Sequence, residues 1–221
     1  MRLATYNIHR AVGADGARDP HRIARVIAAL EADVIGLQEV DWDDVPSDGA
    51  SPYEVLHHLP GYAAVDGPNL RDHRGHYGNL LLTRWPVRTL RRHDISVARR
   101  EPRGVIDADL AGPDGDLRVL VTHLGLRPRE RRAQVERIAA LLDDKPTLLL
   151  GDLNDWMPGA PSLRPLTGRK LPGPASFPAR LPLLALDRVV VLSGRFDPAI
   201  SAHRGALARR ASDHLPVVAD I

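Results

Sequence analysis

The chain has 221 residues, of which 43% are hydrophobic, enough apolar side chains to fill one core. It contains no cysteine, which excludes disulfides, thiol nucleophiles and thiolate metal sites. The formal net charge of +2, from 30 basic and 28 acidic residues, does not mark out a nucleic-acid-binding protein. No run has the apolar length of a signal peptide or membrane span, so we expect residues 1–221 to form a single, soluble, cytoplasmic domain.

The first sixty residues predict alternating strands and helices. Arg2 to Asn7 has the composition of a short strand with a polar end. Asp19 and Pro20 are typical of a helix start, with the aspartate as N-cap and the proline in the first turn. Val34 to Glu39 predicts a buried strand that ends on a carboxylate. We expect a polar loop over 41–52 and a short helix over 53–59. This order favours an α/β fold.

From Gly61 onward the pattern becomes that of consecutive strands with short turns. The Pro-Asp-Gly sequence at 113–115 predicts a hairpin. A helix is expected over 128–142, with apolar residues on one face and arginines on the other. Residues 157–182 are rich in proline, which excludes long regular elements there. The expected strands cover 62–65, 79–83, 87–95, 104–110, 117–123, 186–192, 196–202 and 215–221.

The segment Thr147 to Asn154 holds the most informative pattern in the chain. Residues 147–150, a threonine followed by three leucines, predict a strand that is buried on both faces, and Gly151 permits a close turn after it. Asp152 could accept a proton from water or bind a hard cation. Asn154 lies on the same side if the chain stays extended, because alternate strand residues share a face. A plain turn explains the same residues, since Gly, Asp and Asn are common turn formers.

Other polar residues also stand where apolar runs begin or end. Each of them alone has a structural explanation: a turn residue, a helix or turn cap, or a hydrogen-bonded histidine of the core. As a set they indicate a site, because functional side chains gather at one edge of a sheet scaffold. The set comprises Asn7, Glu39, His123, Asp152, Asn154, Asp187, Asp213 and His214.

The sequence resembles the endonuclease/exonuclease/phosphatase superfamily, which includes deoxyribonuclease I. Seven short signatures occur in the order typical of that superfamily, from residue 5 to residue 217. They are Thr5-Tyr6-Asn7-Ile8, Leu37-Gln38-Glu39-Val40, Tyr77-Gly78-Asn79-Leu80-Leu81, Thr122-His123-Leu124, Gly151-Asp152-Leu153-Asn154, Leu186-Asp187-Arg188-Val189 and Ser212-Asp213-His214-Leu215-Pro216-Val217. The resemblance implies a four-layer α-β-β-α sandwich of two mixed β-sheets, similar to deoxyribonuclease I.

The resemblance also implies a metal-dependent phosphoesterase and a role for each matched residue. Glu39 would hold Mg²⁺, with Mn²⁺ as a substitute, and Asn7 and Asp213 would complete that site directly or through water. Asp152 would orient or deprotonate the attacking water, and Asn154 would fix water or phosphate.

The remaining matched residues would contact the phosphate. His214 would donate to a phosphate oxygen while Asp187 favours its protonated form, and His123 would make a second contact. Arg103 is a further phosphate-binding candidate, although a solvated strand charge explains it equally well.

The substrate is less constrained than the reaction. A phosphodiester of a small or lipid-derived head group is one expectation, and nucleic acid is another. A dedicated DNA endonuclease or exonuclease of the same superfamily is the main alternative, and a non-catalytic binding domain is a third. The chain has only two phenylalanines, three tryptophans and four tyrosines, which argues against a stacking platform for single strands. We expect residues 69–77, with Arg71, His73, Arg74 and His76, to form a loop at the rim of the site.

Overall fold

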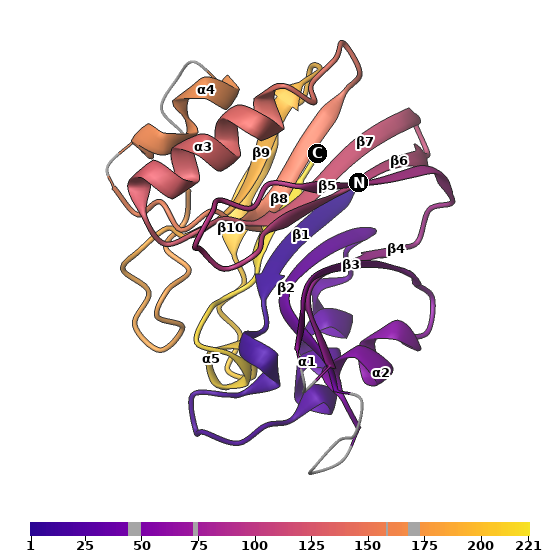
Figure 1. The fold of residues 1–221 in the computed structure, drawn as a ribbon. Helices are drawn as coiled ribbons and strands as arrows, with labels where there is room; N and C mark the ends of the chain where they lie inside the picture. The colour runs from indigo at the N-terminus through magenta and orange to yellow at the C-terminus, as the bar shows by residue number, and fades with distance from the viewer. Residues whose placement is uncertain (44–49, 73–74, 158, 168–172) are drawn as a thin grey trace.

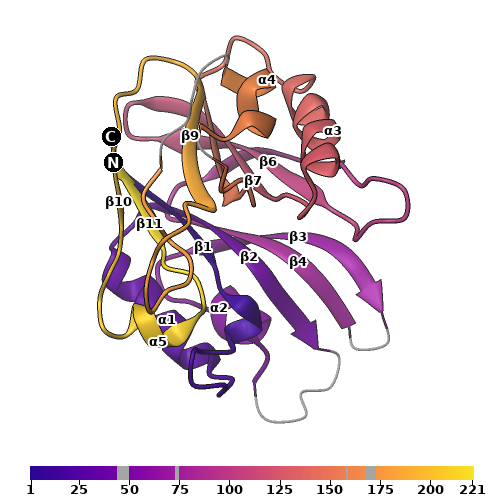
Figure 2. The ribbon, with the colours of Figure 1, turned by 90° about the vertical axis from the view of Figure 1, so that its left-hand side faces the viewer.

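A computed structural model describes residues 1–43, 50–72, 75–157, 159–167 and 173–221. Two mixed β-sheets pack face to face, and helices cover their outer faces, so the chain forms the four-layer sandwich that the resemblance implies (Figures 1 and 2). In the six-stranded sheet the spatial order is β10 (Ala199–Ala202), β11 (Val217–Asp220), β1 (Arg2–Asn7), β2 (Val34–Asp43), β4 (Gly75–Thr83) and β3 (Ala63–Asp72). In the five-stranded sheet it is β5 (Val87–Asp94), β6 (Gly104–Gly112), β7 (Gly115–His123), β8 (Thr147–Asp152) and β9 (Asp187–Ser193).

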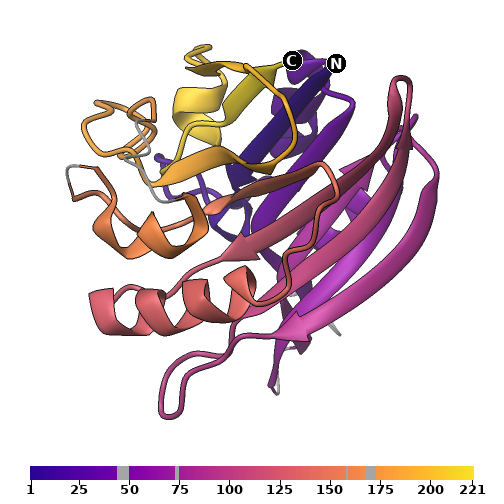
Figure 3. The same ribbon diagram turned by 90° about the horizontal axis from the view of Figure 1, so that it is seen from above.

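Each sheet contains one parallel pair among antiparallel neighbours. β1 pairs in parallel with β2, and β7 pairs in parallel with β8. Because parallel neighbours end at the same edge, the last residues of β1, β7 and β8 become available to a common site. The two termini of the chain lie beside each other at one edge of the sandwich (Figure 3), where the Met1 ammonium donates to the Ile221 carbonyl oxygen.

The helices are α1 (Pro20–Leu30), α2 (Pro52–His57), α3 (Pro128–Ala139), α4 (Arg164–Thr167) and α5 (Ala208–Ala211), with short 3₁₀ turns at His9–Ala11 and Pro161–Leu163. Asp19 caps α1 as predicted, because its side chain accepts a hydrogen bond from the Arg22 backbone amide. No helix in the described residues is long and apolar enough to cross a membrane.

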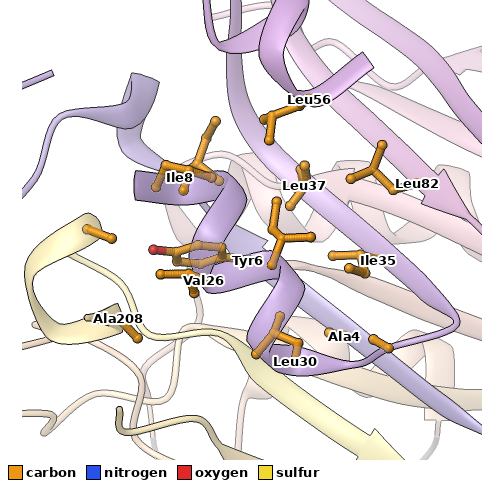
Figure 4. Close-up of a cluster of buried hydrophobic side chains, with 14 of the residues drawn as sticks. Ala4, Tyr6, Ile8, Val26, Leu30, Ile35, Leu37, Leu56, Leu82 and Ala208 are labelled. Carbon is orange, nitrogen blue, oxygen red and sulfur yellow. The ribbon is translucent and has the colours of Figure 1, made fainter. Parts of the chain in front are cut away.

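Three apolar clusters hold the layers together. One lies between the two sheets and contains Val121, Leu148 and Leu150. A second joins the six-stranded sheet to α1, α2 and α5, with Tyr6, Leu37 and other fully buried side chains at its centre (Figure 4). A third lies under α3 and includes Val135 and Ile138 from that helix. The continuous burial of β8 confirms the prediction that its apolar run has no solvated face.

The strands β2, β3 and β4 are longer than predicted. β2 continues past Glu39 to Asp43, and β3 and β4 extend as a paired hairpin through most of the segment predicted as a rim loop. In all three strands backbone pairing continues where the side chains turn polar, because ladder hydrogen bonds do not need an apolar sequence. Helix α3, in contrast, ends at Ala139, three residues before its predicted end. The proline-rich segment holds only a 3₁₀ turn and the four-residue α4 in its described part, as predicted.

Candidate active site

The polar ends of strands from both sheets meet at a cavity of about 580 Å³. Register explains part of this convergence, since His123 is paired with Asp152 across β7 and β8, and Asp152 with Asp187 across β8 and β9. Six of the nine predicted site residues line this cavity. They are Glu39, Arg103, His123, Asp152, Asn154 and His214.

Asn7 connects two of the cavity's carboxylates although it does not line the cavity itself. Its Nδ2 donates to Glu39 Oε1 at 2.9 Å and to Asp152 Oδ2 at 3.0 Å. Its Oδ1 accepts from the His9 backbone amide at 3.0 Å, which fixes the orientation of the side chain. Asn7 is only 1% exposed, so its bond to Asp152 is shielded from water, whereas Glu39 is half-buried at the cavity wall. In this arrangement the amide holds two carboxylates together.

Glu39 occupies a β-bulge, not the strand end that the sequence predicts. The pairing between β2 and β4 shifts between Leu37 and Val40, and Glu39 has a left-handed φ of 59°. A bulge places an extra residue in one strand and redirects its side chain, and a non-glycine residue in this conformation is strained. Here the bulge directs a carboxylate into the cavity within a strand that otherwise continues.

Asp152 and Asn154 are held as a pair at the end of β8. The Asn154 backbone amide donates to Asp152 Oδ1 at 3.0 Å, and Asn154 also has a left-handed φ of 52°. Asn154 Nδ2 donates to the Leu124 carbonyl oxygen at 2.9 Å and to His123 Nε2 at 3.0 Å. Both oxygens of Asp152 and both amide hydrogens of Asn154 are therefore engaged, and the pair is rigid.

The pKa values of the two cavity histidines are shifted in opposite directions. Burial, reinforced by the charge of Arg103, lowers the pKa of His123 to about 3. Burial would also lower the pKa of His214, but the negative charges of Asp187 and Asp152 outweigh burial and raise this pKa to about 10. His214 is therefore protonated, and its Nδ1 donates to Asp187 Oδ2 at 2.8 Å. Its Nε2 lies 3.8 Å from Asp152 Oδ2, while His123 is neutral and accepts from Asn154.

Arg103 brings a buried cation to the cavity wall. Its side chain is only 5% exposed, and Nη2 pairs with Glu101 Oε2 at 3.2 Å. Its buried Nε and Nη1 atoms have no hydrogen-bond partner in the described residues. Since unpaired buried donors are costly, this guanidinium is suited to an anion that enters the cavity.

Asp213 does not line the cavity, and among the described side chains of the expected rim loop only Tyr77 does. Asp213 Oδ1 is 3.6 Å from His9 Nδ1 and accepts from Ser212 Oγ at 3.3 Å. The expected rim loop is the paired end of β3 and β4, where only His76 of the four basic residues has a described side chain. His73 and Arg74, as well as the side chain of Arg71, lie outside the described residues.

Sequence reasoning did not select several residues that shape the site. Arg10 lines the cavity and lies over the Tyr77 ring, 4.6 Å from its centroid. Ser212 Oγ donates to the Asn7 carbonyl oxygen and accepts from the His214 backbone amide, so it joins β1 to the segment before β11. Tyr77 and Ser212 belong to the signatures quoted above, which could have pointed to them. Arg10 sits in an irregular turn whose sequence carries no comparable signal.

The donor chemistry of the cavity fits a divalent cation. Glu39 lines the cavity. Within the described residues its carboxylate accepts a hydrogen bond from Asn7 alone, which leaves lone pairs for a hard cation. Asp152, Asp187 and His214 form a second group of possible ligand atoms, all within 4.8 Å of one another. Within this group His214 Nδ1 and Asp187 Oδ2 are already bonded to each other at 2.8 Å, whereas the Glu39 carboxylate faces the cavity. The geometry therefore favours Glu39 as the metal ligand.

Comparisons with known proteins agree with this geometry. The sequence profile of the Endonuclease/Exonuclease/phosphatase family matches residues 4–214. The chain belongs to this family. It is 31% identical to the protein YbhP of Escherichia coli strain K12, over 100% of this chain and 96% of that protein.

Two further relatives are a nuclease and a protein with a crystal structure. Exodeoxyribonuclease III of Haemophilus influenzae is 29% identical over 70% of this chain and 57% of its own length. The crystal structure of an endonuclease/exonuclease/phosphatase from Beutenbergia cavernae superposes with a TM-score of 0.80 and 25% identity. That match covers 99% of this chain and 70% of the other. The fold and the family are thereby shown, and members of this family are phosphoesterases and nucleases.

Proposed function

We propose that this protein is a divalent-metal-dependent phosphodiesterase that hydrolyses its substrate by in-line attack of a water molecule. The observation that carries the proposal is the hydrogen-bonded unit of Asn7, Glu39 and Asp152, which stands in one cavity beside His214 with its Nδ1 bonded to Asp187. A structural turn at the end of β8 would not require a charged histidine and two carboxylates at a shared amide. Family membership supports the reaction class.

In the proposed reaction, the oxygen of water attacks phosphorus opposite the ester oxygen that leaves. The phosphorus–oxygen bond to the alcohol breaks, the water gives up a proton, and the departing oxygen takes one up. Asp152 would receive the proton of the water, and the hydrogen bonds by which Asn7 and the Asn154 amide hold its carboxylate in one orientation support this role. Asn154 retains Oδ1 to accept a hydrogen bond from that water, since its amide hydrogens are already engaged.

Cationic side chains of this protein would donate hydrogen bonds to the phosphate and neutralise its charge. His214 would donate from Nε2 to a non-bridging oxygen, with Asp187 keeping the ring protonated and oriented. The unpaired Nε and Nη1 of Arg103 would make the second contact. His123 would act through Asn154, as a neutral acceptor that positions its amide.

The cation is proposed to be Mg²⁺, with Mn²⁺ as a substitute, held by Glu39 and water. When bound, such an ion supplies Lewis-acid stabilisation of the charge that develops on phosphate. Asn7 would position Glu39, and Asp213, which lies outside the cavity lining, would contribute only through water or through His9.

A panel of substrates tests the proposal directly. Purified protein is assayed with Mg²⁺ or Mn²⁺ against bis-p-nitrophenyl phosphate, p-nitrophenyl phosphate, plasmid DNA and phospholipid vesicles. We expect metal-dependent turnover of the diester and its loss in excess EDTA. Full activity in EDTA would overturn metal dependence, and turnover of the monoester alone would replace the proposal by a phosphomonoesterase.

A dedicated DNA nuclease is the second candidate, because exodeoxyribonuclease III of Haemophilus influenzae is a relative. A strong preference for plasmid DNA in the same panel would favour it.

A further inference from the structure

Five large apolar side chains stand exposed beside the catalytic cavity, and we call them the apolar rim. They are Leu126, Trp156, Met157, Leu181 and Leu183, between 43% and 74% exposed. In the described residues the other exposed large hydrophobics are Leu90 at 37% and Leu207 at 36%. The rim therefore holds most of the exposed apolar side chains, and their exposure is also the greatest. A concentration of this kind marks an interaction surface.

The rim is continuous with the cavity. Leu126 and Trp156 line it directly, together with Phe177, Leu184 and Leu186 from the segment that carries Leu181 and Leu183. The described part of the segment between β8 and β9, orange in Figure 1, supplies all of these cavity residues except Leu126, and four of the five rim residues, Trp156, Met157, Leu181 and Leu183. One wall of the cavity is thus polar and catalytic, and the other is apolar and leads out to the rim.

Buried side chains hold in place the loops that carry Leu126 and Trp156. Arg131 is 2% exposed, and its Nη1 donates to the Leu126 carbonyl oxygen at 2.8 Å. Its Nη2 lies 3.7 Å from Asp155 Oδ1, and Asp155, fully buried, also accepts from the backbone and hydroxyl of Ser162. One buried guanidinium therefore anchors the loops that present Leu126 and Trp156.

The hairpin of Leu181 and Leu183 is anchored as well. Phe177 and Leu184 pair through their backbones, and the Ala179 amide donates to the Asp213 carbonyl oxygen at 2.7 Å. Ala179 is 1% exposed, whereas the two leucines project at 66% and 69%. The backbone of this hairpin is therefore held in place while both leucine side chains stay exposed.

Arginines flank the rim. Arg127 follows Leu126 in the chain, and with Arg100 and Arg129 it lines a hollow of about 630 Å³ whose wall also includes the buried Glu130. Arg180 precedes Leu181 and is exposed. Apolar side chains with exposed arginines beside them match a surface that is apolar inside and anionic outside.

We propose that the rim docks on an anionic phospholipid surface, from which the cavity takes a phosphodiester of a lipid head group. This inference rests on the proposed function and names its substrate class. A soluble substrate would cover Leu126 and Trp156 in the cavity but would leave Leu181 and Leu183 in water. A nucleic acid could stack on Trp156, yet the four aliphatic rim residues offer no stacking face. A bilayer interface covers all five and suits a half-exposed tryptophan.

Vesicle binding tests the docking surface without turnover. The wild type is incubated in EDTA with vesicles of phosphatidylcholine that contain phosphatidylglycerol, and with vesicles of phosphatidylcholine alone, and bound protein is measured by flotation. We expect binding to the anionic vesicles together with a blue shift of tryptophan emission. Trp156→Phe should abolish the shift, since Trp42 and Trp85 are less exposed and lie apart from the rim.

Matched leucine variants separate the rim from general hydrophobicity. The double variant Leu181→Ser and Leu183→Ser should weaken vesicle binding by about tenfold or more, because each leucine loses favourable burial in the interface. The control with Leu90→Ser and Leu207→Ser should bind as the wild type does. Thermal melting of each variant verifies folding.

The outcomes distinguish this inference from the proposed function. Turnover of bis-p-nitrophenyl phosphate without vesicle binding would overturn the docking surface and leave the phosphodiesterase standing. Vesicle binding without turnover of any diester would retain the surface and remove the substrate assignment. Equal binding by the rim and control variants would overturn the rim. Concentration-dependent dimerisation that the rim variant abolishes would replace the membrane by a second copy of the chain.

Discussion

Asn7 Nδ2 donates to Asp152 Oδ2 at 3.0 Å, and this hydrogen bond joins the end of β1 in one sheet to the end of β8 in the other. The two residues are 145 positions apart in the chain. The same nitrogen reaches Glu39 at 2.9 Å, so one amide sets the spacing between the proposed metal ligand and the proposed base. The site is therefore assembled by packing of the two sheets and not by either sheet alone.

The first prediction concerns Asn7. Replacing Asn7 by alanine should lower turnover of a phosphodiester by about 10²-fold, the scale of losing one preorganised donor. Asn79→Ala is the matched control, because Asn79 is equally buried and donates to the Gly104 carbonyl oxygen at 3.3 Å. Both variants should lose stability of about 0.5–1.5 kcal/mol in denaturant titrations, since each removes a buried side-chain hydrogen bond. Equal losses of turnover in the two variants would make Asn7 merely structural.

The second prediction concerns Glu39. Glu39→Gln removes the charge that attracts a cation while it keeps the shape of the side chain, so calorimetric Mg²⁺ binding should be lost. Phosphodiester turnover should fall by about two orders of magnitude or more. Glu136→Gln is the control, as Glu136 is on the exposed face of α3, paired with Arg132. Unchanged Mg²⁺ affinity in Glu39→Gln would contradict this assignment and indicate that the group of Asp152, Asp187 and His214 binds the metal instead.

The strand ends of the site could be predicted from the sequence because each is a local signal. An apolar run that stops at Asp152 or His123 is visible in a few residues, and the same holds for the N-cap at Asp19. The layers themselves followed only from the resemblance, since strand counting does not specify which strands are neighbours. The parallel pairing of β7 with β8 depends on α3 between them, a contact beyond local sequence.

The features of the site that the sequence did not predict depend on tertiary contacts. The bulge at Glu39 results from pairing between β2 and β4, and an extended run such as Val34 to Val40 shows no sign of it. Arg10 reaches the cavity through three consecutive left-handed residues at 9–11, which a loop sequence does not announce. The apolar rim was missed for a similar reason: leucines in a proline-rich segment look like core residues until the fold exposes them.

The third prediction concerns Asp152 and His214, whose closest charged atoms are 3.8 Å apart. In the proposed reaction both act on one displacement, so their effects should be strongly non-additive. Asp152→Asn and His214→Ala should each be nearly inactive, and the double variant should be little worse than either. Single-turnover rates on one diester provide the comparison. Losses that simply multiply would place the two residues in separate steps.

The fourth prediction concerns stability as a function of pH in EDTA. His214 has a raised pKa, so the folded state binds its proton more tightly than the unfolded chain does. Its contribution is complete below the unfolded value of 6.5 and is lost as pH rises toward about 10. His123 has a lowered pKa, so its contribution is present above 6.5 and is lost as pH falls toward about 3.

The two histidines together predict a stability maximum near pH 6.5. Each arm should have a slope of at most about 1.4 kcal/mol per pH unit for one proton. Guanidinium titrations across this range measure the profile. His214→Gln should flatten the alkaline arm, and His123→Gln the acidic arm. An alkaline arm that persists unchanged in His214→Gln would show that His214 is not the group that keeps its proton.

The last prediction concerns nucleic acid. The described cavity wall carries Arg10 and Arg103, but Glu39, Glu101 and Asp152 stand among them, so it has no broad stripe of positive charge. A small phosphodiester needs only one or two cationic contacts, whereas a duplex needs many. A protein that contacts six or more phosphates would lose roughly 10³-fold in affinity between about 50 and 200 mM salt. We therefore expect modest, non-specific DNA cleavage that does not exceed turnover of small diesters and that depends weakly on salt. Cleavage of plasmid DNA at subsaturating substrate across that salt range provides the measurement. A collapse of the rate by that factor would favour the dedicated nuclease, because only an extended phosphate track produces it.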